Sequence, residues 1–532
     1  MISNRELLKS EKGPEYSPYG KNIKAALAYP NFYPVGMSSL GFQTIYHLLN
    51  SFNNVYCERI FLSEDEKQSS FETKQSLNSF NFLFFSLSFE GDYPNTVKIL
   101  EKGNIPVFAS GRDETHPLVA GGGVCVFLNP EPVAGFFDYF VIGEAEEVLN
   151  KLIDIYAKNY PDGFKTKMDR ESYLKDISKI EGVYVPEFYD FIYNDKNEIA
   201  SVEIQNGAPS KIKRLFIKDL DSLPVLPQIT SPFSEFRNMF LIEIGRGCPY
   251  QCNFCGATSV YKPYRYRSLE SIKKIVLEQG NIESFGLISP AVSCYPEMDE
   301  LFDFFSLKNS RISFSSLRID KIDDKLAHLL SQNNQKTITL APECGSQRMR
   351  NMVNKKIKEG DILQAVENLA ENKIKNIKLY FMIGLPGETQ EDIFAIYALT
   401  QKIRDVTIKI YKNTKNLVKI TIHITPYVPK PHTPWQDVCM SSEEDLKSKL
   451  HFLQKAISGL GSIKLETEDV KSAILQSIFS RGDRRLAGFI KALSRTENKN
   501  WKITGKNMKF IWQKYLSTEH YGKILPWKLI SE

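Results

Sequence analysis

The chain has 532 residues, which is too long for one ordinary domain, and its 42% hydrophobic and 25% charged residues are typical of globular proteins. This composition excludes a disordered or collagen-like chain. The net charge of +5 is small for the length and does not by itself indicate a nucleic-acid partner. The polar N-terminus lacks the apolar stretch of a signal peptide, and no apolar run approaches the ~20 residues of a membrane span. We therefore expect a cytoplasmic protein with no membrane segment.

The first part of the chain alternates short apolar runs with helical patterns, which predicts βαβ units and a mainly parallel sheet. Four runs are expected to be strands: residues 25–30, 80–89, 117–123 and 138–144. Helical spacing covers 38–50 and 93–103, with Gly103 as a helix stop. Ligands of such sheets bind beyond the carboxyl ends of the strands. The loop after the first strand has no GxGxxG motif, so a nicotinamide cofactor is not expected.

A second series of strands follows a polar, proline-punctuated stretch that ends near residue 233. Six segments each combine a strand pattern with a polar or glycine-rich loop: 240–248, 284–290, 312–320, 336–343, 377–388 and 419–430. Helical patterns at 269–280 and 361–373 separate them. This alternation predicts a partial or complete (β/α) barrel, whose active site lies at the C-terminal ends of its strands. After Trp435 the pattern is helical, and Ser441 or Ser442 is expected to cap a helix.

Three of the eight cysteines, Cys248, Cys252 and Cys255, form a CxxxCxxC triplet directly after the first strand of the second series. The five scattered cysteines suggest no disulfide framework and are expected to be buried and inert. Three thiolates can hold three irons of a [4Fe–4S] cluster and leave the fourth iron to a chelating small molecule. The amino and carboxylate groups of S-adenosylmethionine suit that role. Structural zinc requires four protein ligands, and no fourth Cys or His is near in the sequence.

The segment GRGCPYQCNFCGA (245–257) resembles the cluster loop of the radical S-adenosylmethionine superfamily. The resemblance implies that an electron from the cluster cleaves S-adenosylmethionine, and that the resulting 5′-deoxyadenosyl radical abstracts hydrogen from an unactivated carbon. It also implies that Phe254 packs near the adenine. Further positions that resemble the superfamily's S-adenosylmethionine site are Ser289, Ser316, Arg318, Glu343 and Ile383. At Ser289 the GGE motif of the amino-group-binding loop is absent, so this assignment departs from the family pattern.

Residues 116–149 resemble the Rossmann-like cobalamin-binding domain that precedes the barrel in one large branch of this superfamily. Four later segments resemble a group within that branch: 261–268, 380–389, 427–436 and 479–490. The resemblance implies cobalamin as a third cofactor. The positions expected near it are Gly121, Gly122, Gly123, Gly143 and Glu144. The DxHxxG motif, whose histidine ligates cobalt in many cobalamin proteins, does not occur, so no histidine ligand from this motif is expected.

The expected fold is therefore α/β: a Rossmann-like domain of the cobalamin-binding type, a partial (β/α) TIM-type barrel and a helical C-terminal domain. The expected boundaries are an N-terminal extension at 1–20, the Rossmann-like domain at 21–155, a connector at 156–235, the barrel at 236–436 and the C-terminal domain at 437–532.

The activity that the resemblance implies is a methyltransferase that uses two equivalents of S-adenosylmethionine, one as radical source and one to remethylate cobalamin. An external electron donor such as flavodoxin or ferredoxin is expected. The sequence assigns no catalytic residue, and it leaves a peptide or protein, a lipid-like or cofactor-precursor small molecule, and a nucleotide open as substrates.

Two alternatives remain open at this point. A methylthiotransferase acting on RNA or protein needs a second cluster from three upstream cysteines, and only Cys57 and Cys125 precede Cys248. The charged and aromatic residues at 262–267 and the basic segment at 481–485 could form an RNA-binding strip. The other alternative is a non-catalytic corrinoid-binding or metal-binding module.

Overall fold

The protein is represented by a computed structural model, which describes residues 3–224, 226–280, 282–308, 310–314, 317–411, 418–461, 463–496, 500–510, 512–517, 522 and 524–531. The chain forms two compact units. The first contains residues 1–218, 224–239 and 478–532, and the second contains residues 219–223 and 240–477. In the described residues, no helix is both long and apolar enough to cross a membrane.

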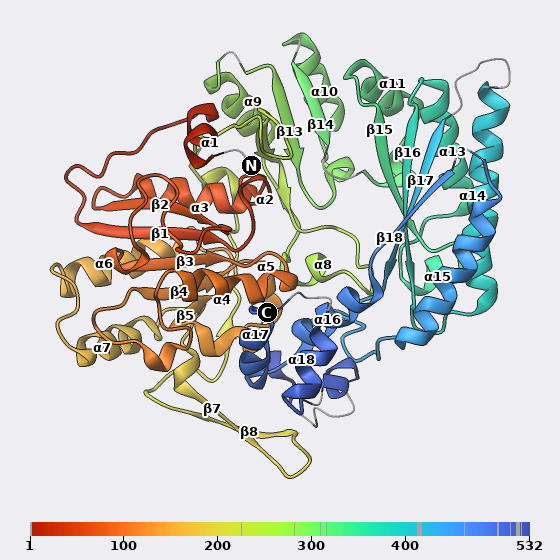
Figure 1. The fold of residues 1–532 in the computed structure, drawn as a ribbon. Coiled ribbons are helices and arrows are strands. Elements are labelled where there is room, and N and C mark those ends of the chain that lie inside the picture. The colour runs from red at the N-terminus through yellow and green to blue at the C-terminus, as the bar shows by residue number, and fades with distance from the viewer. Residues whose placement is uncertain are drawn as a thin grey trace. The chain divides into compact units, whose positions relative to one another are not determined.

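The first unit is built on a six-stranded sheet with the order β2-β1-β3-β4-β5-β6, in which all neighbours are parallel except β5 and β6 (Figure 1). The strands are β1 (Ile23–Tyr29), β2 (Val55–Phe61), β3 (Phe82–Ser86), β4 (Leu118–Gly122), β5 (Tyr139–Val141) and β6 (Val183–Tyr184). The four strands predicted in this region are confirmed as β1, β3, β4 and β5. The strand order reverses between β1 and β3, and ligands of doubly wound sheets bind at that point.

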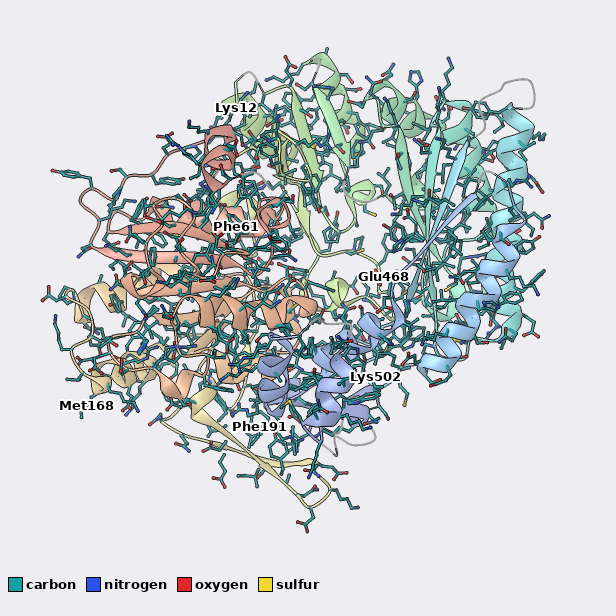
Figure 2. The ribbon with its side chains drawn as sticks, viewed as in Figure 1. Lys12, Phe61, Met168, Phe191, Glu468 and Lys502 are labelled. Carbon is teal, nitrogen blue, oxygen red and sulfur yellow. The ribbon has the colours of Figure 1, made fainter. Side chains whose placement is uncertain are left out.

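The helices of the first unit connect these strands and cover the sheet. They are α1 (Asn4–Ser10), α2 (Tyr33–Gly36), α3 (Leu40–Ser51), α4 (Tyr93–Lys102), α5 (Val124–Leu128), α6 (Val148–Asn159) and α7 (Lys167–Ile177). The predicted helices at 38–50 and 93–103 correspond to α3 and α4, and Gly103 is the C-cap of α4. Phe61 lies in the interior of this unit (Figure 2), where the rings of Tyr33, Phe42 and Phe71 pack against it.

The first unit also contains a hairpin and the C-terminal residues of the chain. The hairpin pairs β7 (Tyr189–Tyr193) with β8 (Ile199–Ile204), and the short β9 (Ile212–Lys213) pairs with the last strand, β19 (Ile530–Ser531). The C-terminal helices are α17 (Ala487–Leu493) and α18 (Trp501–Asn507). The boundary between the units falls within α16 (Val470–Arg481). These two units are fewer than the five segments predicted from sequence, whose boundaries stay a prediction.

The second unit carries two parallel sheets, with the orders β10-β13-β14 and β15-β16-β17-β18. Their strands are β10 (Phe240–Glu243), β13 (Ser284–Ile288), β14 (Arg311–Phe314), β15 (Thr337–Glu343), β16 (Asn376–Ile383), β17 (Lys419–Pro426) and β18 (Ile463–Thr467). All six strands predicted for the barrel are present, and their parallel arrangement agrees with the predicted partial (β/α) barrel. β18 is a seventh parallel strand, in a region that the sequence predicted to be helical.

Helices alternate with the strands of the second unit. They are α8 (Gly256–Val260), α9 (Leu269–Glu278), α10 (Met298–Leu307), α11 (Asp324–Gln332), α12 (Gln347–Met352), α13 (Glu359–Glu371), α14 (Gln390–Tyr411) and α15 (Glu443–Ser458). Ser442 caps α15 through its hydroxyl, as one of the two predicted caps. α14 and α15 lie along one face of the β15–β18 sheet (Figure 1). The buried side chains of β16 and β17 alternate with half-buried ones, so only one face of this sheet is fully apolar.

Candidate functional site

The cysteine triplet lies in the loop between the short strand β11 (Gly245–Arg246) and α8. β11 pairs with β12 (Arg265–Tyr266) in a tight antiparallel ribbon, which requires glycine at two positions. A Cβ at Gly245 would lie 2.8 Å from the carbonyl oxygen of Arg265, and one at Gly247 would lie 2.3 Å from that of Tyr261. Gly247 also has a φ of +79°, which L side chains rarely adopt. The GRG segment therefore sets the backbone path into the cysteine loop.

We expect Gly247→Ala to lower the iron content of the anaerobically reconstituted protein severalfold, because both the clash and the left-handed φ displace the backbone before Cys248. The measurement is iron per chain. Gly360→Ala is the matched control, since no atom lies within 4 Å of a Cβ there. Equal iron contents in the two variants would contradict this role for Gly247.

The cysteine loop is fastened to the segment that follows α12. The Asn253 backbone N–H donates to the Val353 carbonyl (3.1 Å), and its side-chain amide donates to that of Met352 (2.8 Å). In return, the Asn354 amide donates to the Gln251 carbonyl (2.6 Å). These bonds hold the loop beside the C-terminal end of β15.

Cys252 is buried, whereas Cys248 and Cys255 are partly exposed. Burial raises the pKa of Cys252 to about 11, with Lys355 acting in the opposite direction and the thiols of Cys255 and Cys248 adding to the increase. Burial also raises the pKa of Cys248. The three cysteines fall within eight residues of one loop, between β11 and α8. Among the described residues, no group of three or more His, Cys, Asp or Glu side chains is arranged around a single metal ion.

Two cations face the cysteine loop. Lys355 opposes the increase in the pKa of Cys252, and Arg318 does so for Cys248. A cluster bound through three thiolates is anionic, so nearby cations favour its formation. The three thiols on one loop, the partial exposure of Cys248 and Cys255, and the two cations fit a [4Fe–4S] cluster.

Glu343 ends β15 beside this loop in a left-handed conformation, with a φ of +65°. The register between β15 and β16 shifts at this point, which marks a bulge. The Glu343 carboxylate pairs with the Lys355 ammonium at 2.8 Å, and both side chains are largely buried. A strained non-glycine backbone costs of the order of 1–3 kcal/mol and is concentrated at functional sites. Lys355 follows Asn354, which is hydrogen-bonded to Gln251 of the cysteine loop. The pairing with Lys355 therefore places Glu343, a predicted S-adenosylmethionine position, next to this loop.

Arg318 connects the loop with two other segments. Its guanidinium carbon lies 3.4 Å from the centre of the Tyr250 ring, and its Nε donates to Asp320 at 2.8 Å. It also donates to the Lys355 carbonyl at 3.3 Å. Arg318 therefore lies beside the cysteine loop, and the contacts that the structure records for it are with the protein itself.

Phe254 packs on a hydrophobic cluster at the same end of the sheet. The buried members of this cluster are Cys344, Met349, Val353, Leu385 and Tyr427, and Phe254, Met382, Trp435 and Val438 pack against it. Ile383 is fully buried at the end of β16, adjacent to Met382. Ser289 is buried at the end of β13 and accepts a hydrogen bond from the Ala291 N–H. Ser316 lies outside the described residues.

The structure thus brings Cys252, Phe254, Arg318 and Glu343 around one end of the β15–β18 sheet. Sequence reasoning missed Lys355, Asn253 and Met382, because a lone lysine, asparagine or methionine carries no motif. The pairing of Glu343 with Lys355, twelve residues later, crosses a helix and a loop, so no local pattern indicates it. The roles of all the predicted site residues stay predictions.

The predicted cobalamin positions lie at the carboxyl ends of β4 and β5, and most of their glycines are required by internal packing. A Cβ at Gly121 would lie 2.7 Å from the Phe140 ring, and one at Gly123 would lie 2.6 Å from the Leu87 carbonyl oxygen. A Cβ at Gly143 would lie 2.2 Å from the carbonyl oxygen of Leu215.

Glu144 accepts a hydrogen bond from the Ile217 N–H at 2.7 Å and is buried. Gly122 is the exception among the glycines, because the nearest atom to its Cβ position is 3.9 Å away. The fold therefore accounts for four of these five residues, and Gly122 leaves room above the sheet edge.

The loop after β1 contains Asn31, Tyr33 and Gly36 at the spacing of the missing DxHxxG motif. Tyr33 stands in the histidine position, but its hydroxyl donates to Glu11 at 2.7 Å and its ring packs among Phe61 and Phe71. Its phenol is therefore held in the interior of the first unit. A Cβ at Gly36 would lie 2.5 Å from the Phe61 ring, so this glycine serves packing.

Asp92 lies at the switch point of the sheet, where its carboxylate accepts hydrogen bonds from Asn31 (2.9 Å) and Asn95 (3.5 Å). Burial raises its pKa to about 7 against the effect of these amides. The folded state therefore binds more protons than the unfolded state between about pH 4 and pH 7, and stability decreases as pH rises through this window.

Asparagine cannot ionise, so we expect the Asp92→Asn variant to have the same free energy of unfolding as the wild type near pH 4. At pH 8 we expect the variant to be more stable than the wild type by a few kcal/mol, because each unit of pKa shift corresponds to about 1.4 kcal/mol. Denaturant unfolding at both pH values measures this. If variant and wild type differed in free energy of unfolding by the same amount at both pH values, the raised pKa of Asp92 would be contradicted.

The segments 262–267 and 481–485, which could form an RNA-binding strip, do not present their arginines as an exposed basic surface. Arg265 and Arg267 are buried, and they donate to the main-chain carbonyls of Pro263 and Leu220. Arg484 pairs with the buried Glu131, and Arg485 pairs with Asp483. These arginines therefore hold the fold together.

Comparisons with known proteins identify the family. A family model that describes the N-terminal region of radical SAM proteins matches residues 41–186. The radical SAM superfamily model matches residues 242–400. The uncharacterized protein MJ0966 of Methanocaldococcus jannaschii is 32% identical over 480 residues, which are 88% of this chain and 90% of that protein. The chain belongs to the radical SAM superfamily.

Two further relatives match only part of the chain. The uncharacterized methyltransferase PH0819 of Pyrococcus horikoshii is 22% identical over 38% of this chain and 45% of its own length. The ribosomal protein uS12 methylthiotransferase RimO of Alkaliphilus oremlandii is 23% identical over 31% of this chain and 41% of its own length.

Among solved structures, the cobalamin-dependent S-adenosylmethionine radical enzyme OxsB, with aqua-cobalamin and S-adenosylmethionine bound, superposes with a TM-score of 0.52. The match has 12% identity and covers 90% of this chain and 72% of OxsB. The fold is therefore similar to that of OxsB. The chain is a radical SAM enzyme, whose family cofactors are a [4Fe–4S] cluster and S-adenosylmethionine.

Proposed function

We propose that the chain is a cobalamin-dependent methyltransferase that methylates an unactivated carbon. The observation that carries the proposal is the likeness of the fold to cobalamin-bound OxsB over nine tenths of the chain. The partial match to the methyltransferase PH0819 supports the same reaction class. The switch point between β1 and β3, with Gly122 on the neighbouring β4, supplies an edge where a large planar cofactor can rest.

In this proposal, Cys248, Cys252 and Cys255 hold the cluster, and Phe254, Ser289, Ser316, Arg318, Glu343 and Ile383 surround S-adenosylmethionine. When bound, the cluster and S-adenosylmethionine supply a radical that removes hydrogen from carbon, and cobalamin supplies the methyl group. The protein's own contribution is to hold the anionic cluster against Lys355 and Arg318. An external donor such as flavodoxin or ferredoxin supplies electrons.

Glu343 has two tasks in this arrangement. Its pairing with Lys355 keeps both charges compensated in a largely buried environment, which would otherwise be unfavourable. Its strained position at the bulge of β15 fixes the carboxylate at the strand end, where it can accept hydrogen bonds from S-adenosylmethionine.

A methylthiotransferase is the second candidate, because RimO matches part of the chain. That reaction needs a second cluster in the N-terminal region. Cys57 and Cys125, the two cysteines before the triplet, are both buried, and Cys57 has its pKa raised well above the ordinary value by burial. The second cluster needs three cysteines, and the sequence has only these two before the triplet, so we favour methyl transfer. A non-catalytic corrinoid-binding or metal-binding module is disfavoured by membership of an enzyme superfamily.

The proposal is tested by anaerobic reconstitution with iron, sulfide and hydroxocobalamin, followed by reduction in the presence of S-adenosylmethionine. We expect 5′-deoxyadenosine from the cluster site and S-adenosylhomocysteine that forms only when cobalamin is bound. Formation of 5′-deoxyadenosine with no cobalamin-dependent S-adenosylhomocysteine would overturn the methyltransferase and leave the radical enzyme.

A further inference from the structure

Positive charge is concentrated in the C-terminal segment of the chain. Residues 484–532 contain eleven Lys and Arg residues and three Glu residues, a net charge of +8 in a chain whose total net charge is +5. The residues before this segment are therefore acidic overall. A marked charge asymmetry within one chain indicates that its basic part interacts with a polyanion. The proposed site uses no residue of this segment.

Part of this charge serves the fold, and part of it lies at the surface. The three arginines of the segment form ion pairs with acidic side chains of the first unit. Four lysines differ from them, and we call them the C-terminal lysine surface: Lys491 on α17, Lys502 and Lys506 on α18, and Lys509, which follows α18. Lys506 and Lys509 are exposed, and Lys491 and Lys502 are half-buried. With the described residues, Lys491, Lys506 and Lys509 form no ion pair.

α18 buries its aromatic side and presents its lysines. Trp501 and Gly505, four residues apart, are both buried. Lys502 and Lys506 are also four residues apart, so their side chains project from one side of the helix. The Lys502 ammonium lies 5.2 Å from the centre of the half-buried Trp512 ring, a contact that does not neutralise its charge. Figure 2 shows Lys502 among the C-terminal helices.

The lysines of the two helices adjoin one another. A Cβ at Gly488 of α17 would lie 3.8 Å from the methyl carbon of Met508, so the segment that contains Met508 passes close to α17. Lys509 directly follows Met508. Lys491 lies three residues after Gly488 and therefore on the same side of α17. Aromatic rings from both segments pack against one another below the lysines, so this surface rests on a rigid base.

The composition of the surface indicates which polyanion it fits. An ammonium is a point charge that binds phosphate, whereas protein–protein interfaces are depleted in lysine. An acidic protein is therefore a poorer fit than a chain of phosphates. Binding to an anionic membrane requires an apolar helix face turned outward. On α18 only Ile503 is an exposed large apolar side chain, while Trp501 is turned inward.

We propose that the C-terminal lysine surface binds RNA through its phosphates. RNA is favoured over duplex DNA because Phe510 and Trp512, next to the lysines, are half-buried rings on which unstacked bases can rest. This binding function goes beyond methyl transfer and does not depend on it, since none of the four lysines belongs to the proposed cofactor site.

The test measures the Kd of the full, reconstituted chain for fluorescently labelled, unfractionated transfer RNA by anisotropy, between about 50 and 200 mM salt. The variant combines Lys502→Gln, Lys506→Gln and Lys509→Gln. The matched control combines Lys151→Gln, Lys158→Gln and Lys175→Gln, three exposed lysines on α6 and α7 of the same unit. A DNA duplex and polyglutamate are the competing probes. Melting temperature and iron content confirm that each variant is folded and loaded.

We expect the triple variant at the C-terminal lysine surface to raise the Kd for transfer RNA by at least about tenfold at about 0.1 M salt. The slope of log Kd against log salt concentration should also fall by about two, because each phosphate contact contributes about 0.7 to 0.9 to that slope. The control triple variant should match wild type in both quantities. The DNA duplex and polyglutamate should bind the wild type more weakly than transfer RNA.

The inference would be overturned if the wild type did not bind transfer RNA at the lowest salt concentration, or if wild type and the triple variant had equal Kd values and salt slopes. Equally tight binding of the DNA duplex or of polyglutamate would overturn the assignment of RNA. The binding is measured without S-adenosylmethionine, so each of these results leaves the proposed methyl transfer standing, and a failure of methyl transfer leaves the RNA binding standing.

Discussion

A Cys252→Ala variant is expected to purify with little iron and to form 5′-deoxyadenosine more than about 10³-fold more slowly than wild type. Cys252 is the buried member of the triplet and lies opposite Lys355. Two remaining thiolates cannot hold a cubane cluster with one open iron. Iron analysis and chromatographic detection of 5′-deoxyadenosine under reducing, anaerobic conditions measure the two effects.

Cys439→Ala is the control for this experiment, because Cys439 is exposed and lies outside the loop. It should keep both iron and activity. If Cys252→Ala formed 5′-deoxyadenosine at the wild-type rate, the triplet would not be the cluster site.

The second large effect is expected in stability, at the contact between the C-terminal residues and the N-terminal domain within the first unit. Arg484 pairs with Glu131 at 2.8 Å, and Tyr184 also donates to this carboxylate, which is almost fully buried. Arg484→Leu leaves the Glu131 carboxylate buried without its cation, so we expect a loss of about 3–5 kcal/mol in the free energy of unfolding. Denaturant unfolding measures the loss.

Arg495→Leu provides a matched comparison in the same segment. Arg495 pairs with Glu101 at 2.8 Å, but its side chain is 68% exposed, so its removal should cost less than about 1 kcal/mol. The double variant Glu131→Gln, Arg484→Leu should recover part of the loss of the single variant, because the buried charge is gone. Equal losses for the two arginine variants would contradict a structural role for the Arg484 and Glu131 pair.

The sequence predicted those strands whose apolar side chains form continuous runs. β3 and β4 are buried on both faces of a parallel sheet and therefore consist almost entirely of apolar or small residues. β2 was missed because Glu58 and Arg59 interrupt its pattern, although both are buried. Arg59 is compensated by Glu11 and Glu72, which are remote in the sequence. No local pattern can reveal such a pairing.

The same limit applies to the candidate site. The cysteine motif and its glycines determine a local loop, so the sequence predicted that loop directly. The neighbours of the loop come from β15, from the segment after α12 and from Arg318, and their approach depends on tertiary packing. Likewise, β18 was missed because Lys464 and Glu466 make it polar. Glu466 forms ion pairs with Lys464 on the same strand and with Lys378 on β16. The second pair can be recognised only from the order of the strands in the sheet.

We propose that this one chain carries both a radical-generating cluster and cobalamin. The most direct measurement is the metal content and visible absorption of anaerobically reconstituted, desalted protein. We predict about four iron atoms and about one cobalt per chain, with iron–sulfur absorption overlaid by that of a corrinoid. A protein that retains iron but no cobalt would contradict the cobalamin assignment, and a colourless, iron-free protein would contradict the account as a whole.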